Sequence, residues 1–338
     1  MKRKILTFIL LLSLIFSLFS CEFVRVTPPV QKRLFYDFFD TVGTFYDYSG
    51  VGEKTFSARA DKVEEKLSEY HKLYDIYHEY EGIVNLATLN RLAGKGPQKV
   101  DKRIINLLLF AKEMYVVTGG EVNIAMGTVL KIWHDCRAEG VRIPTEEELK
   151  VAYAHTNIDN IIIDEENLTV ELLDPEMRID VGAIAKGYSV EMVADELRRD
   201  GVSGCVIDVG GNLSAIGTKP DGDGWSTGVK NPDRQEGGYV YTFTIKDCSA
   251  VTSGSYERFF EVGGKRYHHI IDKDTLFPSD FYTSVTVVCD NSALSDALST
   301  ALFNMDFEEA KTLAESLNGV FCVFVFPDGE VRTVGEIC

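Results

Sequence analysis

The residues from Asp180 to Tyr188, with the sequence DVGAIAKGY, bring an acid, small residues and a lysine together. The run from Leu172 to Ile179 before them predicts a strand, and the periodicity of Ser189 to Arg199 after them predicts an amphipathic helix. A strand-to-helix junction exposes backbone N–H groups at the positive end of the helix, where phosphates bind. The spacing matches neither the GxGxxG dinucleotide fingerprint nor the GxxxxGK[ST] phosphate loop. The segment therefore predicts a phosphate-rich ligand that is bound by a different arrangement.

A carboxylate and a hydroxyl, Asp296 and Thr300, lie four residues apart in a helix predicted from Leu294 to Met305. Residues with this spacing share one face of a helix. Two hard oxygen ligands form a partial site that suits Mg²⁺, which keeps its other positions for water and substrate phosphate. The same pattern also occurs on an ordinary polar face near a helix N-terminus, so both interpretations stay open.

Two other segments carry groups that suit binding or catalysis. In Thr252 to Arg258, hydroxyls such as that of Ser253 surround a glycine and could donate to phosphate or flavin oxygens, although a turn between edge strands has the same composition. Further on, His268 and His269 are adjacent, and a histidine can act as a general base near neutral pH. Neighbouring strand residues point to opposite faces, so we expect at most one histidine to face a given site. A purely structural histidine is the alternative.

The overall composition restricts the class of partner. The chain has 338 residues, of which 45% are hydrophobic, and a formal net charge of -17. Such an acidic balance argues against nucleic acid as a partner, because a phosphate backbone needs a basic face. It also argues against electrostatic docking on anionic lipid. An acidic protein that binds a phosphate ligand is expected to recruit a metal cation for it.

The N-terminus has the pattern of an export signal. Residues 1–20 combine a basic start with an apolar run that is too short for a membrane span. The run ends in LFSC, which resembles the bacterial lipobox, so we expect Cys21 to be lipidated and residues 21–33 to form its tether. The protein would then be extracytoplasmic and anchored to the cell membrane, on the periplasmic or outer surface side. An ordinary signal peptide with an incidental cysteine is the alternative.

The remaining chain, residues 34–338, is expected to form one catalytic domain. Helical periodicity and strand-like runs alternate along it without a low-complexity linker. Strands in series with interspersed helices predict an α+β fold with a mainly antiparallel sheet. Helices are predicted at 57–77, 102–118, 145–153, 294–305 and 307–317, and strands at 161–163, 169–173, 205–209, 239–245, 284–289 and 319–326, after a strand pair within 34–48.

Taken in order along the chain, these segments resemble the ApbE family, the FAD:protein FMN transferases, which are typically periplasmic or surface lipoproteins. The resemblance covers nearly the whole mature chain. The segments that carry it are 42–44 (VGT), Tyr80 with Asn90, 120–123 (GEVN), 180–188, 210–212 (GGN), 252–258, His269 to Asp272 with Thr275 and Pro278, and Asp296 with Thr300. It implies a T-fold-like arrangement of mainly antiparallel sheets with packed helices.

The resemblance implies a role for individual residues. Asp180 and Lys186 would contact FAD, and the carbonyl of Ala183 would join Asp296 and Thr300 as a magnesium ligand. The other residues that it and the hydroxyl pattern place around FAD are Val42, Tyr80, Glu121, Val122, Asn123, Ser253 and Ile271. His269 would lie nearest the chemistry. The chain departs from the family at Val42, where methionine is usual, and at Leu276, where glycine is usual.

The implied reaction is a Mg²⁺-dependent transfer of the FMN moiety of FAD, its substrate, to a threonine or serine hydroxyl, with release of AMP. His269 or Asp296 would take the hydroxyl proton. The acceptor would be an extracytoplasmic flavoprotein subunit of a membrane redox complex. Two alternatives remain: a metal-dependent FAD pyrophosphatase that forms FMN and AMP, and a non-catalytic lipoprotein that binds or scavenges FAD.

Overall fold

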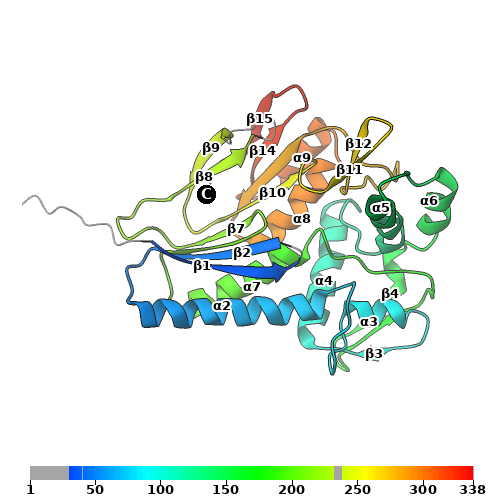
Figure 1. The fold of residues 1–338 in the computed structure, drawn as a ribbon, viewed down its shortest axis with the longest axis horizontal. Coiled ribbons are helices and arrows are strands. Elements are labelled where there is room, and N and C mark those ends of the chain that lie inside the picture. The colour runs from blue at the N-terminus through cyan, green and yellow to red at the C-terminus, as the bar shows by residue number, and fades with distance from the viewer. Residues whose placement is uncertain (1–29, 40, 232–237, 338) are drawn as a thin grey trace, which may run out of the picture.

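A computed structural model describes residues 30–39, 41–231 and 238–337; the predicted signal peptide and Cys21 lie outside them. Its centre is an eight-stranded sheet in which every pair is antiparallel (Figure 1). In spatial order the strands are β1 (Gln31–Phe38), β2 (Thr41–Asp47), β6 (Cys205–Val209), β7 (Asn212–Ile216), β10 (Ser249–Gly254), β13 (Ser284–Cys289), β14 (Phe321–Val325) and β15 (Val331–Val334). Because β1 begins at Gln31, residues 31–33 belong to this sheet rather than to a tether.

The two faces of the sheet bury different apolar clusters, because successive side chains of a strand point to opposite sides. Val287 packs with the helices of one face, and its neighbour Val288 packs with the β8–β9 hairpin on the other. The hairpin consists of β8 (Trp225–Lys230) and β9 (Tyr239–Ile245). The molecule therefore has three layers at this point: helices, central sheet and hairpin.

The helices gather mainly on one side of the sheet (Figure 1). They are α2 (Glu53–Tyr74), α3 (Leu86–Arg91), α4 (Lys102–Val117), α5 (Gly127–Glu139), α6 (Glu146–Tyr153), α7 (Ala185–Arg199), α8 (Ser292–Phe303), α9 (Phe307–Ser316) and a 3-10 turn (Ile158–Asn160). Of these, α7 and α8 pack against each other and against strands β7, β10 and β13. The pair is the part of the fold that carries both the predicted phosphate junction and the predicted metal half-site.

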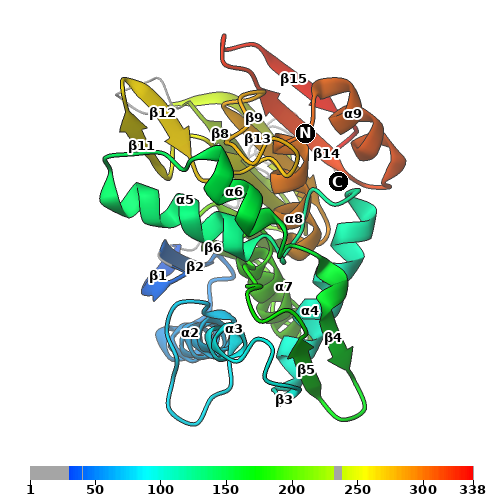
Figure 2. The same cartoon turned by 90° about the vertical axis from the view of Figure 1, so that its right-hand side faces the viewer.

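Two small sheets complete the fold. One has the order β3 (Gln98–Lys99), β5 (Thr169–Leu172) and β4 (Ile161–Asp164); the other pairs β11 (Phe259–Val262) with β12 (Lys265–His268). The β11–β12 hairpin lies beside α5 (Figure 2), and the Trp133 ring centroid is 6.3 Å from that of Phe260 and 5.9 Å from that of Tyr267. This aromatic contact attaches α5 to the edge of the site.

The α+β class with mainly antiparallel sheets is confirmed, and most predicted elements lie where they were expected. The helix predicted at 145–153 begins with a capping box, in which Thr145 and Glu148 are bonded reciprocally. The strand predicted from Leu172 to Ile179 was wrong: β5 ends at Leu172, and a turn follows in which Asp174 accepts the N–H of Glu176. An acidic residue before Pro175 favours such a turn over an extended strand. Helix α7 also begins four residues before the predicted Ser189.

Across residues 30–39, 41–231 and 238–337, no helix has the length and apolar character needed to cross a membrane.

Candidate active site

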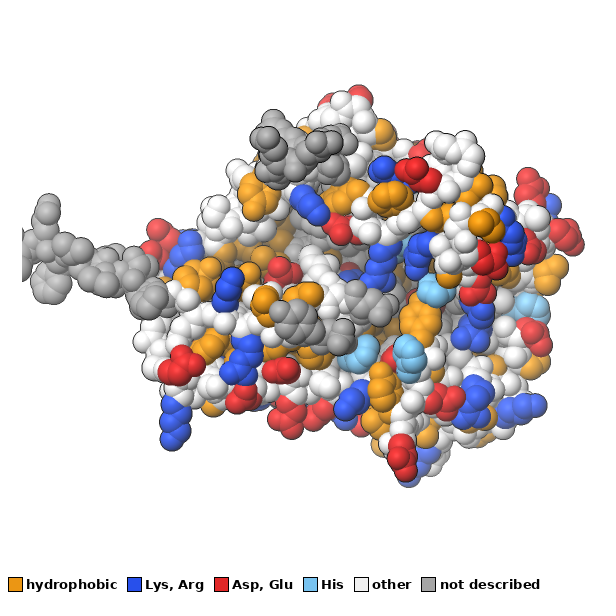
Figure 3. All heavy atoms as spheres, viewed as in Figure 1, with side chains coloured by type: hydrophobic (Ala, Val, Ile, Leu, Met, Phe, Trp, Pro, Cys, Tyr) orange, Lys and Arg blue, Asp and Glu red, His pale blue; other side chains and the backbone are white. Residues whose placement is uncertain are grey.

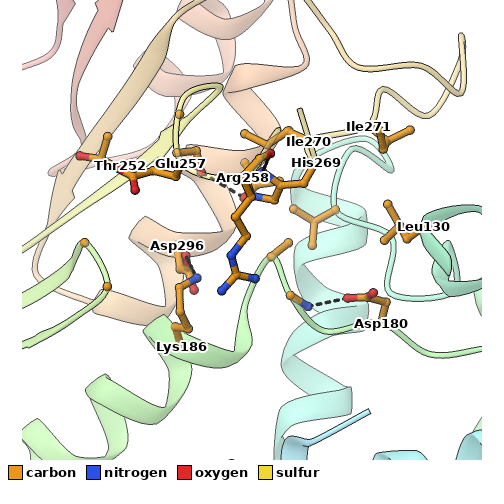
Figure 4. A pocket seen from close by; sticks show the side chains of 18 of the residues that line it. Leu130, Asp180, Lys186, Thr252, Glu257, Arg258, His269, Ile270, Ile271 and Asp296 are labelled. Atoms are coloured by element: carbon orange, nitrogen blue, oxygen red, sulfur yellow. Dashed lines mark hydrogen bonds and ion pairs between the residues drawn. The ribbon is translucent and has the colours of Figure 1, made fainter. Parts of the chain in front are cut away.

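A cavity of about 1020 Å³ opens where the helices, the central sheet and the β11–β12 hairpin meet. Residues from the α7 N-terminus, α8, β10, α5 and the segment after β12 line it (Figure 4). In the space-filling view, lysine, arginine and histidine side chains gather over the middle of this face, although the chain is acidic overall (Figure 3). These basic side chains suit an anionic ligand.

The first turn of α7 meets α8 at the base of the cavity. The Gly187 N–H donates to Asp296 Oδ2 at 2.8 Å, and Lys186 Nζ lies 3.8 Å from Asp296 Oδ1. The close approach depends on Gly187, because a Cβ atom there would lie 2.4 Å from both Asp296 Cβ and the Ser292 carbonyl oxygen. Burial raises the pKa of Asp296 above its usual value, while Lys186 opposes the shift. The Gly187 N–H and the Lys186 ammonium therefore hold the carboxylate in place.

Three hydroxyl groups lie close together beside Asp296 on α8. Ser253 Oγ lies 2.8 Å from Ser299 Oγ and 3.3 Å from Thr300 Oγ1, and the Ser299 hydroxyl donates to the Asp296 backbone oxygen at 3.0 Å. These bonds join β10 to α8. They also place the Thr300 hydroxyl on the cavity side of α8, one turn beyond Asp296, where both residues line the cavity together with Ala183.

This donor set fits a magnesium ion. No group of three histidine, cysteine, aspartate or glutamate side chains within the described ranges could hold a metal. Instead the cavity offers a buried carboxylate, hydroxyls and the Ala183 peptide, all hard oxygen donors of the kind that Mg²⁺ accepts while keeping several waters. The raised pKa of Asp296 indicates a buried negative charge that a divalent cation would stabilise.

The loop between α4 and α5 forms a second wall, which carries Glu121, Val122 and Asn123. Asn123 fixes the loop: its Oδ1 accepts the Ala125 N–H at 2.9 Å and its Nδ2 donates to the Thr156 oxygen at 3.0 Å. The backbone of Asp180 joins this wall through its N–H, which bonds to the Ile124 oxygen at 2.8 Å. Burial raises the pKa of the Asp180 carboxyl, which accepts the Gly182 N–H. Asp180, Lys186 and the 121–123 loop thus face one cavity.

Glu121 is a buried carboxyl group with a hydrogen-bond partner for only one of its two oxygens. Its Oε1 lies 3.2 Å from Lys273 Nζ, but its buried Oε2 has no hydrogen-bond partner. Burial raises the pKa of Glu121 to about 7, despite the opposing charge of Lys273. The free oxygen can therefore accept a hydrogen bond when ionised or donate one when protonated, both near neutral pH.

We expect Glu121→Gln to stabilise the protein at alkaline pH. The folded state retains a proton on Glu121 up to about pH 7 that the unfolded state loses near pH 4.5, so folding stability falls as the pH rises between these values. Glutamine does not ionise. The difference in unfolding free energy between the variant and the unsubstituted protein should therefore be more favourable to the variant at pH 8 than at pH 4.5, by on the order of 3 kcal/mol. Urea unfolding of both proteins at the two pH values measures this. If the two proteins differed in unfolding free energy by the same amount at both pH values, the raised pKa of Glu121 would be contradicted.

The two adjacent histidines take different roles, as strand geometry requires. His268 is buried, its Nε2 donating to the Ser279 carbonyl at 2.7 Å, whereas His269 lines the cavity. His269 Nδ1 lies 3.2 Å from the Arg258 carbonyl oxygen. A carbonyl can only accept, so Nδ1 carries the proton and Nε2 keeps a free lone pair. Desolvation of the ring by the surrounding protein, together with the positive charge of Arg258, lowers the pKa of His269. The ring is therefore neutral at pH 7.

The turn after His269 contains Leu276, at the position where the resemblance implied a departure from glycine. Leu276 adopts φ 61°, in the left-handed region. Its carbonyl accepts the Trp133 indole N–H at 2.9 Å, and its side chain is buried in the cluster around Trp133. Leucine at such a φ is strained by about 1 kcal/mol or more. The burial of its side chain offsets that strain and keeps Ile271 at the cavity wall.

Two of the predicted site residues do not line the cavity in this structure. Val42 has an exposed side chain on β2, next to Thr41, which does line it. The hydroxyl of Tyr80 donates to Asp75 Oδ2 at 2.8 Å, which holds the ring in a loop after α2. The aromatic residue that lines the cavity from this loop is Tyr77 instead.

Sequence reasoning missed the wall that α5 contributes. Lys131, His134 and Arg137 line the cavity from this helix, and Arg178 lines it from the segment before Asp180. The spacing of Lys131, His134 and Arg137 follows the helical period, so a helix predicted from 127 to 139 would have placed these basic side chains on one face. The site consequently has more positive charge than the motifs alone indicate.

The buried Glu191 carboxylate positions α8 against α7. Glu191 of α7 accepts the Ser292 N–H at the start of α8 and pairs with Arg198 at 2.8 Å. We expect Glu191→Ala to lower the unfolding free energy by on the order of 2–3 kcal/mol, because it leaves Arg198 partly unpaired and an N–H of α8 unbonded. Asp195→Asn is the matched control, because Asp195 is half-exposed and shares Arg198 at 2.9 Å.

Urea unfolding measures this loss, and isothermal titration measures Mg²⁺ and FAD binding. We expect weaker Mg²⁺ binding for Glu191→Ala and unchanged binding for Asp195→Asn. Equal effects of the two substitutions would contradict the positioning role.

Comparison with known proteins agrees with these features. The model of the ApbE family matches residues 42–324. A Treponema pallidum protein named FAD:protein FMN transferase is 34% identical over 267 residues, covering 75% of this chain and 73% of that protein. A Klebsiella pneumoniae protein of the same name is 31% identical over 275 residues, covering 81% and 84%. The crystal structure of the Thermotoga maritima ApbE protein superposes with a TM-score of 0.80 at 25% identity, covering 90% of this chain and 97% of that one. The chain therefore belongs to the ApbE family.

Proposed function

We propose that this protein is a Mg²⁺-dependent FAD:protein FMN transferase. It moves the FMN moiety of FAD to a threonine or serine hydroxyl of an acceptor protein and releases AMP. The observation that carries the proposal is the meeting of α7 and α8, where Lys186, the buried Asp296 carboxylate and the Thr300 hydroxyl line one cavity. The relatives with the name FAD:protein FMN transferase support it.

The site divides the binding of FAD between its walls. Lys186, at the positive end of α7, and Arg258, whose side chain extends toward Lys186 and Asp296, would neutralise the pyrophosphate (Figure 4). Asp180 and the 121–123 loop would bind the polar edges of the substrate, and Ile271 would pack on its rings. Asp296, Thr300 and the Ala183 carbonyl would hold Mg²⁺, which neutralises charge on both phosphates when bound.

The transfer exchanges one phosphorus–oxygen bond for another. The acceptor hydroxyl oxygen bonds to the phosphorus that carries riboflavin, and the bond from this phosphorus to the bridging oxygen breaks. AMP leaves with the bridging oxygen as a phosphate anion, which needs no proton. The hydroxyl proton passes to Nε2 of His269 and then to solvent, because Nδ1 is engaged with the Arg258 carbonyl. Asp296, which accepts the Gly187 N–H, serves the metal rather than this proton.

The cellular setting is part of the same proposal. The export signal and Cys21 support an enzyme anchored by lipid on the extracytoplasmic side of the membrane. Its acceptor would be an extracytoplasmic flavoprotein subunit of a membrane redox complex. Radiolabelled palmitate in the expressing cell tests the anchor: label on the full chain and none on a Cys21→Ser variant is expected, and label on neither would contradict it.

The decisive experiment uses the soluble chain from Glu22 with FAD and Mg²⁺. Extracytoplasmic protein of the expressing cell serves as the source of acceptors, and AMP release and flavin fluorescence on a denaturing gel are followed together. Covalent flavin that appears in step with AMP supports the transferase. AMP and free FMN without covalent flavin would make the enzyme a pyrophosphatase, and FAD binding without AMP would leave a binding protein.

A further inference from the structure

The cavity continues from the helix face of the central sheet to its hairpin face. On the helix face, Ser253 bonds to Ser299 of α8. Its neighbour Thr252 also lines the cavity but points to the opposite side, where its Oγ1 lies 2.8 Å from that of Thr286. The FAD and metal residues proposed above lie on or near the helix side. The hairpin side has no role in those assignments.

We call this second part of the cavity the hairpin arm. It is lined by Asp208, Leu213, Thr227, Gly228, Phe243, Ala250, Thr252 and Thr286. Leu213, Phe243 and Ala250 belong to the apolar cluster that joins the hairpin to the sheet. Apolar and hydroxyl side chains therefore make up most of the lining, and Asp208, which is paired with Leu213 and points to the same face of the sheet, is its acidic group.

Strand β8 borders the hairpin arm with an edge that is unpaired within the described ranges. It pairs with β9 alone in a two-stranded sheet. Trp225 and Val229 point to the central sheet, so Thr227 between them points the same way. Gly228 also lines the arm although its direction is opposite, which indicates that the β8 backbone itself is accessible there. An edge of this kind can pair with an extended polypeptide.

The chemistry of the transfer requires a second route to the phosphorus atom. The attacking oxygen and the leaving oxygen lie roughly in line on opposite sides of the phosphorus, so the acceptor cannot enter along the AMP half of FAD. With FAD on the helix side, the hairpin arm reaches Asp296 and Thr300 from the other side of the sheet through the same continuous cavity. Gly211 and Gly254, at the ends of β7 and β10, line the cavity where it passes from one face of the sheet to the other.

We propose that the hairpin arm binds an extended segment of the acceptor protein, which pairs with β8 and carries its hydroxyl residue to the phosphorus. The inference rests on the proposed transferase function. The lining of apolar and hydroxyl groups with Asp208 favours small residues without negative charge around the modified threonine or serine, because an anion there would lose its hydration next to a carboxyl group. At the outer rim, Lys230 and Glu257 form an ion pair at 3.1 Å that can exchange for charges farther along the segment.

Adjacent positions of β8 supply a matched test. Thr227→Phe places an aromatic ring in the hairpin arm, whereas Ser226→Phe places the same ring on the exposed outer face of the hairpin. The probe is a phage-displayed library of twelve-residue peptides with a fixed central threonine, incubated with FAD and Mg²⁺ and recovered by covalent flavin. FAD binding by fluorescence and AMP release without peptide are measured in parallel.

We expect Thr227→Phe to lower the yield of flavin-labelled peptide at least tenfold, with FAD binding and peptide-independent AMP release unchanged. The Ser226→Phe variant should give the same yield of flavin-labelled peptide as the unsubstituted protein. Peptides that the unsubstituted protein labels should also slow hydrogen exchange of the Trp225–Lys230 amides.

Two results would overturn the proposal in different ways. If the two variants labelled peptides equally, the hairpin arm would not bind the acceptor. The same would follow if peptides slowed hydrogen exchange only outside Trp225–Lys230. In both cases the proposed transferase function would stand. No labelled peptide from the unsubstituted protein, with AMP still released, would overturn the transferase and the arm together.

Discussion

Replacing Asp296 by asparagine is expected to lower FMN transfer at least a thousandfold while the folded protein remains stable. The carboxylate is buried at the meeting point of α7 and α8, and Lys186 Nζ lies 3.8 Å from Oδ1. Asparagine keeps an oxygen for the Gly187 N–H but removes the charge that would bind Mg²⁺. Losses of this size are typical when a group that stabilises developing phosphate charge is removed. AMP release and covalent flavin at saturating FAD measure the effect.

The stability of this variant separates a catalytic role from a structural one. Burial raises the pKa of Asp296, so its ionised form costs folding free energy at neutral pH, and asparagine should not destabilise the protein. Asp290→Asn, at an exposed position just before α8, makes the same change in charge and should retain full activity. An active Asp296→Asn protein would remove the metal role that we assign to this residue. So would an inactive one with unchanged Mg²⁺ binding.

Gly187→Ala is expected to lower the unfolding free energy by about 3 kcal/mol and to abolish transfer. Helix propensity alone predicts the opposite sign, because alanine is favoured over glycine inside a helix by about 1 kcal/mol. Sterics decide here: the added Cβ would lie 2.4 Å from Asp296 Cβ and from the Ser292 carbonyl oxygen. Since the Ser292 oxygen is part of the backbone, α7 and α8 must move apart, at a cost typical of overpacking. Urea unfolding and Mg²⁺ titration measure both effects.

A glycine in open space provides the control. Gly52 precedes α2 with ordinary φ, and a Cβ atom there would meet nothing within 4 Å. Gly52→Ala should therefore change the unfolding free energy by no more than about 1 kcal/mol and leave transfer intact. If Gly187→Ala behaved in the same way, the close packing of α7 on α8 would not be what positions Asp296.

The sequence predicted which residues carry the chemistry better than it predicted where these residues lie in space. Asp296 with Thr300, and Lys186 within the small-residue segment, could be recognised because their roles depend on local helix geometry. The buried strands were predictable for the same reason, since a period of two or an apolar run is a local signal. Tyr80 illustrates the limit: the loop after α2 turns so that Asp75 binds its hydroxyl and Tyr77 lines the cavity instead.

By itself, the sequence determined the α+β class, the membership in the ApbE family and most of the residue types around the cavity. Only the tertiary structure decided that Gly187 meets Asp296 across 109 residues, that α5 adds its cations to the wall, and that the cavity extends to both faces of the sheet. The physical reason is that periodicity and capping depend on neighbours within a few residues, which the sequence displays directly. The distance between α7 and α8 depends on steric fit between segments far apart in the chain, which only packing determines.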